Sequence, residues 1–340
     1  MSPERRASLS AGVFALALLR PGAAGAWSSN GHRVIGLIAQ SLLQEEAQRG
    51  DQSSQAALGA VSALLGPGVG LSDVAPCADL VRDLGKEPDR SGEEIHFHCG
   101  GLVWRTDPLT LPWHFVDIPI TAADAADSID AHCGDDCVVA QIKKDVLVLQ
   151  DPASLLPAKR EALMFLVHFV GDEHQPLHCA TEIVDGQDDR GGNDKKVKFD
   201  GQPLNMHALW DHLIQTSDGL NDPVPLAERL TAQLPPGATS QWTQGDFVAD
   251  AALESLAIAQ RTIYPAYYAA ARSSVHGRRR RAAALPADYQ SRMEPIVEER
   301  LQKAGVRLAV LLKRALANAG ALSTGGPAVR KASKKLQPVH

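Results

Sequence analysis

Apolar side chains follow helical spacing along most of the chain. After His32 the first apolar positions are Val34, Ile35, Ile38, Leu42 and Leu43. Positions with this spacing line one face of a helix. The same period recurs over residues 135–150, 157–174, 246–272 and 289–320. The pattern predicts an all-α protein.

One segment departs from the helical pattern. Lys195–Phe199 lies between the turn signals Gly191-Gly192 and Asp200-Gly201, so we expect a short hairpin on a loop. No long β-branched alternating run occurs elsewhere, no repeat of fixed period is visible, and no Ser/Gly-rich linker divides residues 27–320. We therefore expect a single helical domain over residues 27–320.

The first 26 residues have the three parts of a secretory signal peptide. Basic residues precede an apolar stretch from Leu9 to Leu19, and Ala24-Gly25-Ala26 provides a small-residue cleavage site. The apolar stretch is too short to span a bilayer. We expect cleavage after Ala26, with Trp27 as the new N-terminus. The mature protein would be secreted or periplasmic, without a membrane anchor.

The composition excludes several classes of protein. The 340 residues are 44% hydrophobic and 22% charged, which favours a globular protein that folds as a monomer over a disordered chain. The net charge of -6 argues against a broad basic surface that binds nucleic acid. Five cysteines are too few for a disulfide scaffold. The 12 histidines are the one unusual feature of the composition.

Two basic segments look peripheral. The loop at residues 277–281 contains four consecutive arginines, and the tail at residues 321–340 carries four further cationic side chains. Runs of like charge are usually solvated. We expect a solvated loop and a disordered tail.

Two histidine–aspartate pairs are candidate metal ligands. His168 and Asp172 lie four residues apart on one predicted helix, and Pro176 ends that helix just before His178. His207 and Asp211 repeat the four-residue spacing in the next helical segment. A lone buried histidine is usually a core residue, and a lone His–Asp pair is usually an exposed ion pair. Two such pairs together indicate a zinc site with mixed nitrogen and oxygen ligands.

Further donors lie upstream, and together with these pairs they define a family resemblance. The chain resembles the S1/P1 nuclease family, the secreted zinc-dependent nucleases that prefer single strands. The matching residues are Trp27 with Gly31-His32, Ala78-Asp79 with Arg82, His114–Asp117 (HFVD), Gly171–His178 (GDEHQPLH), Asp189–Asn193 (DRGGN), Asn205–Asp211 (NMHALWD) and Ala304–Leu312 (AGVRLAVLL).

The resemblance implies an all-α fold similar to zinc phospholipase C and a cofactor of three zinc ions. The first ion would be bound by Asp79, His114, His168 and Asp172. The second would be bound by His178, His207 and Asp211. The third would be bound by the free amine and carbonyl of Trp27, by His32 and by a bridging Asp172. A terminal amine is a good ligand, so this assignment depends on removal of the signal peptide.

The resemblance also implies a reaction and a substrate. The protein would hydrolyse single-stranded DNA and RNA to 5'-phosphate products, with 3'-nucleotidase activity in addition. Asp79 and Arg82 would be catalytic, with Arg82 stabilising transition-state charge. Phe115 would stack on a base and Asp117 would bind its edge. The residues alone leave Phe115 open between stacking and core packing.

Two alternative functions remain at this point. The same fold and metal cluster could serve a zinc phospholipase C, although Asp211 in place of Glu, together with Phe115 and Asp117, suits a nuclease better. The cluster could also be purely structural in a non-catalytic extracellular zinc-binding protein. Arg82 argues against that alternative, because a structural site has no use for an anion-stabilising cation.

The cysteines depart from the family. Relatives usually carry Trp before the Ala-Asp pair, where this chain has Cys77. The resemblance implies a short disulfide loop between Cys133 and Cys137, which an exported protein can form. The partners of Cys77, Cys99 and Cys179 stay open.

Overall fold

The structure is a computed structural model that describes residues 27–85, 95–106, 109–122, 125–217, 222–273 and 282–317. The expected signal peptide at 1–26, the basic loop at 277–281 and the tail at 321–340 all lie outside the described residues.

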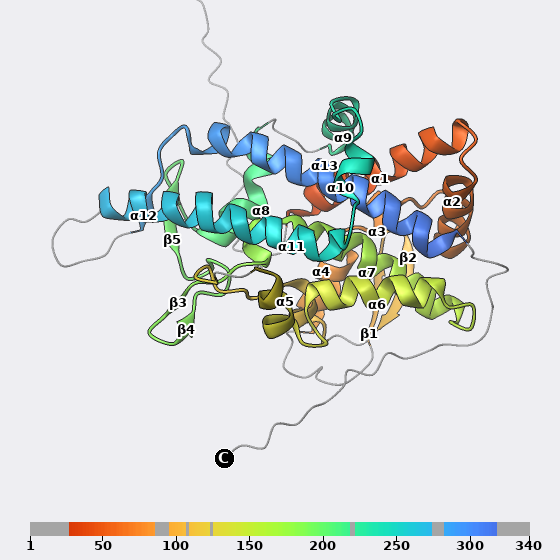
Figure 1. Ribbon diagram of the computed structural model, residues 1–340, viewed down its shortest axis with the longest axis horizontal. Coiled ribbons are helices and arrows are strands. Elements are labelled where there is room, and N and C mark those ends of the chain that lie inside the picture. Colours follow the sequence, from red (N-terminus) through yellow and green to blue (C-terminus); the bar gives the residue numbers. More distant parts are fainter. Residues whose placement is uncertain are drawn as a thin grey trace, which may run out of the picture.

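Helices make up most of the described part of the chain (Figure 1). The α-helices are α1 (Ser29–Gln48), α2 (Gln52–Leu65), α3 (Leu71–Val74), α4 (Cys77–Leu84), α5 (Ala125–Cys133), α6 (Val138–Gln150), α7 (Leu156–His174), α8 (Met206–Ser217), α9 (Val224–Ala232), α10 (Ala238–Trp242), α11 (Phe247–Ile258), α12 (Tyr264–Ser273) and α13 (Tyr289–Leu316). Short helical turns are η2 (Leu111–His114), η3 (Pro176–His178) and the π-helical η4 (Ala259–Ile263). The all-α prediction is confirmed.

The predicted helical segments appear with small shifts. The pattern after His32 corresponds to α1, and residues 157–174 correspond to α7. The segment at 135–150 begins later, at Val138, because Cys137 occupies the N-cap position of α6. The segment at 246–272 is interrupted by the π-helical η4 between α11 and α12. The last helix ends at Leu316, four residues before the predicted boundary.

The strands are short and form hairpins beside the helices. They are β1 (Ile95–Cys99), β2 (Leu102–Thr106), β3 (Ile183–Val184), β4 (Gln187–Asp188), β5 (Lys196–Phe199), β6 (Gln202–Asn205) and β7 (Ala283–Ala284). The antiparallel pair β5–β6 confirms the predicted hairpin, and β7 joins β5 in parallel. The expectation that no other segment forms a hairpin was wrong, because β1 pairs with β2 and β3 with β4. Each pair is joined by a two-residue turn with positive φ, Gly100-Gly101 or Asp185-Gly186, and such dipeptides are hairpin signals that helical periodicity does not detect.

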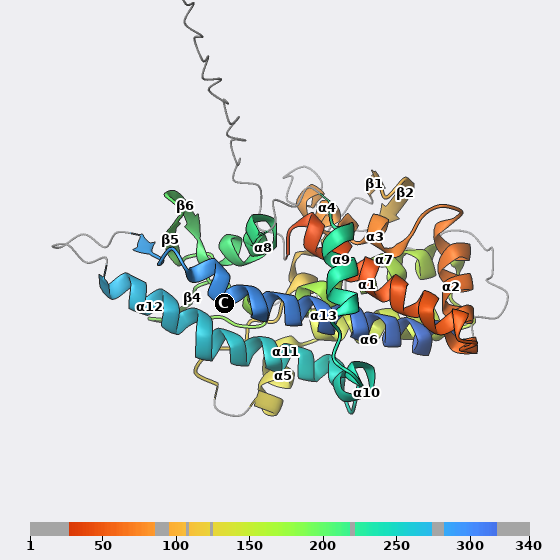
Figure 2. The same ribbon diagram turned by 90° about the horizontal axis from the view of Figure 1, so that it is seen from above.

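The long helix α13 organises the core. It runs along most of the long axis of the molecule in both views (Figures 1 and 2). It packs against α1, α2, α6, α7 and α8. Helix α7 is covered on all sides, and every residue from Glu161 to His174 is buried. An all-round buried helix holds its side chains rigidly, so His168 and Asp172 project from a fixed support.

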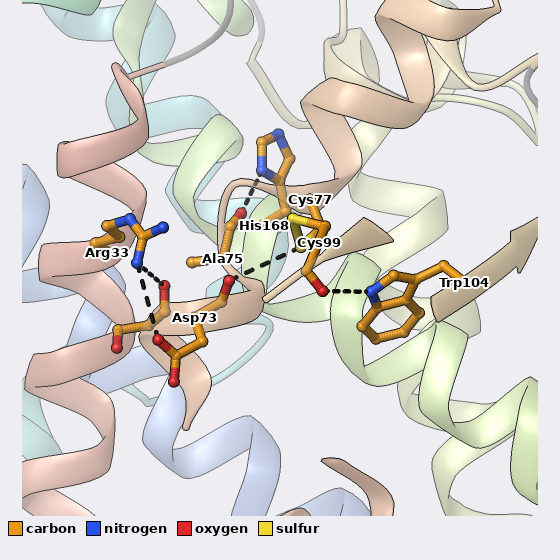
Figure 3. The surroundings of a disulfide bond; sticks show 8 residues. Arg33, Asp73, Ala75, Cys77, Cys99, Trp104 and His168 are labelled. Atoms are coloured by element: carbon orange, nitrogen blue, oxygen red, sulfur yellow. Dashed lines mark hydrogen bonds and ion pairs between the residues drawn. A yellow bond between two sulfur atoms is a disulfide. The ribbon is translucent and has the colours of Figure 1, made fainter. Parts of the chain in front are cut away.

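Two disulfides are present and one described cysteine is free. Cys77, the first residue of α4, is bonded to Cys99 at the end of β1 (Figure 3). Cys133 is bonded to Cys137, as the family resemblance implied. Cys179 is buried and free. Among the described helices none has the length and apolar character needed to cross a membrane.

Candidate metal centre

The first cluster of metal-ligand side chains surrounds Asp172 on α7. Its carboxylate lies 3.3 Å from Nε2 of His32 on α1, 2.8 Å from Nδ1 of His114 on η2, and 3.2 Å from Nε2 of His168 one helical turn earlier. Asp79 of α4 lies 3.4 Å from Nε2 of His168. The structure thus brings five predicted ligands from four separate elements to one point.

The second cluster lies beside it, between η3 and α8. Nε2 of His178 is 3.1 Å from Nε2 of His207, and Nε2 of His207 is 3.8 Å from Oδ2 of Asp211. One ligand atom from each of these three residues lies within 4.8 Å of the other two. Pro176 ends α7 and begins η3, which turns His178 back toward α8.

Backbone carbonyls orient three of the imidazoles. Nδ1 of His168 donates to Ala75 O at 2.7 Å, and Nδ1 of His178 donates to His114 O at 2.7 Å. Nδ1 of His207 donates to Gly191 O at 2.8 Å. A carbonyl can only accept, so the proton stays on Nδ1 and Nε2 keeps its lone pair in the neutral ring. In each case Nε2 points into the cluster, as a metal ligand requires.

Two glycines leave space for the histidine side chains of the clusters. A Cβ at Gly171 would lie 2.7 Å from Nδ1 of His32, so a larger residue would displace that imidazole. Gly191 has φ of +61°, and a Cβ there would lie 2.3 Å from Leu177 O. The same Cβ would lie 3.2 Å from Nδ1 of His207, so glycine at each position leaves room for a neighbouring histidine.

Burial and charge set the protonation of the centre. Burial lowers the pKa of His178 to about 3 and that of His207 to about 4, so both rings are neutral near neutral pH. Burial alone would lower the pKa of His168, but the carboxylates of Asp172 and Asp79 raise it to about 10. Burial raises the pKa of the Asp211 carboxyl well above its usual range. A bound cation would reverse both raised values, because it favours the deprotonated ligand forms.

The donor set fits a metal such as zinc. Some buried polar atoms make no hydrogen bond within the described part of the chain, among them His114 Nε2 and Asp211 Oδ2. Buried polar atoms without partners are rare, and a bound ion is one explanation for them. Imidazole nitrogens and carboxylate oxygens are the ligands that zinc takes in mixed sites.

Arg82 lies beside the first cluster. Its guanidinium is almost fully buried and lies 2.6 Å from Oδ1 of Asp79, one helical turn earlier on α4. It also contacts Asp83. Arg82 therefore holds a fixed positive charge at the edge of the metal centre.

A cavity of about 410 Å³ opens onto the centre. Its lining contains Arg82, His114, His178 and His207, and also the predicted substrate-binding residues Phe115 and Asp117. Both of these are only partly buried. Phe115 is therefore not fully enclosed in the core, the alternative that the sequence had left open, and its stacking role stays a prediction.

The cavity also contains residues to which the sequence had given no role. These are Leu111, Leu177, Asp188, Arg190, Gly191 and Asn193. Four of them lie in or next to the DRGGN segment, which the resemblance had singled out without assigning a function. Asp188 immediately precedes that segment and had no signal of its own.

Trp27 lies fully buried at the start of the described chain. The amide of the next residue, Ser28, donates to the backbone carbonyl of Asp211 at 2.8 Å. This bond ties the expected new N-terminus to the helix that carries His207 and Asp211. His32 groups with Asp79 and His168 as well as with Asp172, its expected partner. The assignment of ligands to individual ions stays a prediction.

The chain is similar in sequence to known nucleases over most of its length. The chain is 31% identical to Endonuclease 4 of Arabidopsis thaliana over 306 residues, which cover 85% of this chain and 88% of that protein. It is 28% identical to Nuclease S1 of Aspergillus oryzae, over 89% of this chain and 95% of that protein. It is also 28% identical to Nuclease P1 of Penicillium citrinum, over 66% of this chain and 74% of that protein. A family model described as S1/P1 Nuclease matches residues 27–317, and this chain therefore belongs to the S1/P1 nuclease family.

Proposed function

We propose that this chain is a secreted, monomeric zinc nuclease that hydrolyses phosphodiester bonds of single-stranded DNA and RNA and leaves 5'-phosphates. The family is zinc-dependent, and relatives over most of the chain carry nuclease names. The observation that carries the proposal is a pair of His/Asp clusters beside a cavity. Arg82 and Phe115 also line this cavity.

The centre would hold three zinc ions. Asp79, His114, His168 and Asp172 would bind the first, and His178, His207 and Asp211 the second. The amine and carbonyl of Trp27, with His32 and a bridging Asp172, would bind the third. When bound, zinc would supply a hydroxide near neutral pH and positive charge for the phosphate.

The chain's own residues would position the substrate and stabilise its charge. Arg82 would donate to phosphate oxygens as negative charge builds up, and Asp79 would hold the guanidinium in place through their 2.6 Å ion pair. Phe115 would stack on a base and Asp117 would contact the edge of that base. Stacking on one ring needs an unstacked base, which favours single strands.

The cavity argues for a polar substrate over a phospholipid. Asp117 forms part of its lining and has no hydrogen-bond partner within the described part of the chain, so an acyl chain would bury this carboxylate unpaired. The same features argue against a purely structural metal site, which needs no cavity. Hydrolysis of 3'-mononucleotides is a further expected activity.

A metal count combined with a substrate panel tests the proposal. The mature protein should contain three zinc ions and should hydrolyse single-stranded DNA and RNA, with 5'-phosphate products. Phosphatidylcholine should not be cleaved. Zinc-loaded protein that cleaves phosphatidylcholine and no nucleic acid would be a phospholipase, and zinc-loaded protein inert to every ester would be a binding protein.

Processing at Trp27 gives a second test. Protein made with several extra residues before Trp27 has every side chain but lacks the free amine at that position. It should bind about one zinc fewer and lose most activity, because an amide nitrogen is a poor ligand. Metal analysis before and after proteolytic removal of the extension measures this. Equal zinc content in both forms would remove the amine from the ligand set.

A further inference from the structure

Two carboxylates, Asp117 and Asp188, line the same cavity as the ring of Phe115. Asp117 follows η2, and the amide of its neighbour Val116 donates to His178 O at 2.8 Å. Thr181 N donates to Ile118 O at 2.9 Å on the other side. These backbone bonds fix the position of Asp117. Asp188 ends β4, and one of its oxygens accepts from Arg190 N at 2.9 Å.

Asp117 has no hydrogen-bond partner within the described part of the chain. Burial raises the pKa of its carboxyl, and the negative charges of Asp188 and Asp189 raise it further, to about 6. The carboxylate thus lies partly buried beside like charge and without a donor. Such an arrangement is unfavourable unless a ligand supplies the missing donors.

The nearby charged groups are held by other partners. Arg190 contacts Asp194 at 2.6 Å, and Arg82 contacts Asp79. Asp189 accepts from the Tyr264 hydroxyl and from the amides of Glu182 and Gly192. The groups around Asp117 that carry or can carry charge are Arg82 (α4), His114 (η2), His178 (η3), Asp188 (β4), Asp189 and Arg190 (the loop after β4), and His207 (α8).

Ionised carboxylates only accept hydrogen bonds, so a wall with two of them favours a base edge rich in donors. Guanine presents N1–H and the N2 amino group side by side. Uracil and thymine present one N–H between two carbonyl oxygens, which two carboxylates would repel. A site that is built to bind a donor rejects an analogue that lacks it more strongly than an apolar pocket rejects a small size difference.

We propose that Asp117 and Asp188 together form an acceptor pair that makes this nuclease prefer guanine over uracil or thymine at the base held by Phe115. The inference rests on the proposed nuclease function and deepens it, since it assigns Asp188 as a specificity-determining residue.

Dinucleoside monophosphates test the proposal. The kcat/KM of the zinc-loaded enzyme is measured for substrates in which the base on either side of the phosphate is guanine, adenine, cytosine or uracil. The wild type should prefer guanine over uracil by about tenfold or more at one of the two positions. Asp188→Asn should lower kcat/KM for guanine by about tenfold and change that for uracil by no more than about twofold.

Asp185→Asn is the matched control. Asp185 lies in the turn of the same β3–β4 hairpin, has φ of +53° that asparagine tolerates, and does not line the cavity. It removes the same charge three residues away and should leave the base preference unchanged. Zinc content and melting temperature, measured for both variants, show whether either substitution disturbs the fold.

The pH profile of the preference gives an independent readout. The guanine-to-uracil ratio should fall as pH drops through about 6, because a protonated Asp117 loses an acceptor. Asp188→Asn removes a negative charge that raises this pKa, so the midpoint should move to lower pH. Because zinc chemistry affects both substrates alike, the ratio isolates the base site.

The outcomes are distinguishable. Equal kcat/KM for all four bases would overturn the inference and leave the nuclease function standing. An Asp188→Asn variant that loses activity equally on every base, or a preference that Asp185→Asn also abolishes, would overturn it as well. No hydrolysis of any dinucleotide or longer single strand would contradict the proposed function itself.

Discussion

Arg82 is a buried cation that is paired with two carboxylates. Its side chain is only 3% exposed and contacts both Asp79 and Asp83. An unpaired guanidinium at this depth would be strongly unfavourable, so the two carboxylates are what allow a cation beside a metal centre. The same arrangement leaves Arg82 in the cavity lining, where a phosphate can reach it.

Loss of this cation should slow turnover without removing the metal. For Arg82→Ala we expect unchanged zinc content and a kcat lower by roughly 10²-fold, as for loss of one oxyanion-stabilising donor. Arg82→Lys keeps the charge and loses the planar guanidinium, so its kcat should lie between those of the wild type and Arg82→Ala. Steady-state kinetics with metal analysis measures this. Normal turnover in Arg82→Ala would exclude Arg82 from the mechanism.

The ligands differ in how many partners they contact. Asp172 lies within 3.3 Å of His32, His114 and His168, whereas His207 is near His178 and Asp211. Asp172→Asn should therefore release more zinc and reduce activity more than His207→Ala. Zinc stoichiometry by elemental analysis, alongside activity, ranks the two variants. The reverse order would argue against Asp172 as a bridging ligand.

At the level of elements, the position of α4 decides whether Asp79 and Arg82 reach the centre. The segment before α4 is held at Ser72 and Asp73 by Arg33, at Ala75 by His168, and at Cys77 by the disulfide to Cys99 (Figure 3). The ring of His168 thus joins the metal cluster at Nε2 and the approach to α4 at Nδ1. Metal binding and the placement of α4 should be coupled.

The two disulfides should therefore differ in their effect on zinc. The chain-entropy model gives about 3 kcal/mol of stabilisation for a loop the size of Cys77–Cys99 and about 2 kcal/mol for a loop as short as Cys133–Cys137. Cys77→Ser with Cys99→Ser should weaken zinc retention during competition with a chelator, because the first turn of α4 loses its tether two residues before Asp79.

The matched control is Cys133→Ser with Cys137→Ser. That bond lies at the start of α6, next to the Val138 amide that donates to Phe115 O at 3.2 Å. We expect normal zinc retention in this variant. Competition curves that coincide for the two double variants would show that the Cys77–Cys99 bond stabilises the fold without acting on the metal site.

At the level of the whole molecule, the predicted side-chain ligands come from six elements: α1, α4, η2, α7, η3 and α8. Their side chains are mostly fully buried, so the fold brings several ionisable groups together away from water. Bound metal would offset the cost of this arrangement, and the free energy of metal binding would then add to the free energy of folding.

Chelation should therefore lower stability as well as activity. After dialysis against a chelator we expect loss of hydrolysis and a melting temperature lower by at least several degrees. Zinc should restore both, and magnesium neither, because the donor set is rich in imidazole. Calorimetry and an activity assay on the same samples provide the measurement. Full activity in the chelator would contradict the zinc mechanism.

Features that depend on residues close together in the chain could be predicted from the sequence. Helical periodicity identified α1, α6, α7 and α13, because burial of one face repeats every 3.6 residues. The pairs His168/Asp172 and His207/Asp211 followed from spacing on a single helix, and turn glycines identified the β5–β6 hairpin. His178 followed from the turn at Pro176 just after the first pair. The other predicted ligands, Trp27, His32, Asp79 and His114, came from the family resemblance, since no local pattern links residues so far apart.

The Cys77–Cys99 pairing and the proposed role of Asp188 became known only from the fold, because both depend on contacts between distant segments. The Cys77–Cys99 bond joins residues 22 positions apart, and five cysteines allow many pairings. The β1–β2 pairing has a local signal in its Gly100-Gly101 turn, whereas the burial of Phe97 and Trp104 in the core depends on the tertiary structure. Asp188 became a candidate only when folding placed it in the same cavity as Asp117, because an exposed carboxylate gains a role from its neighbours in space.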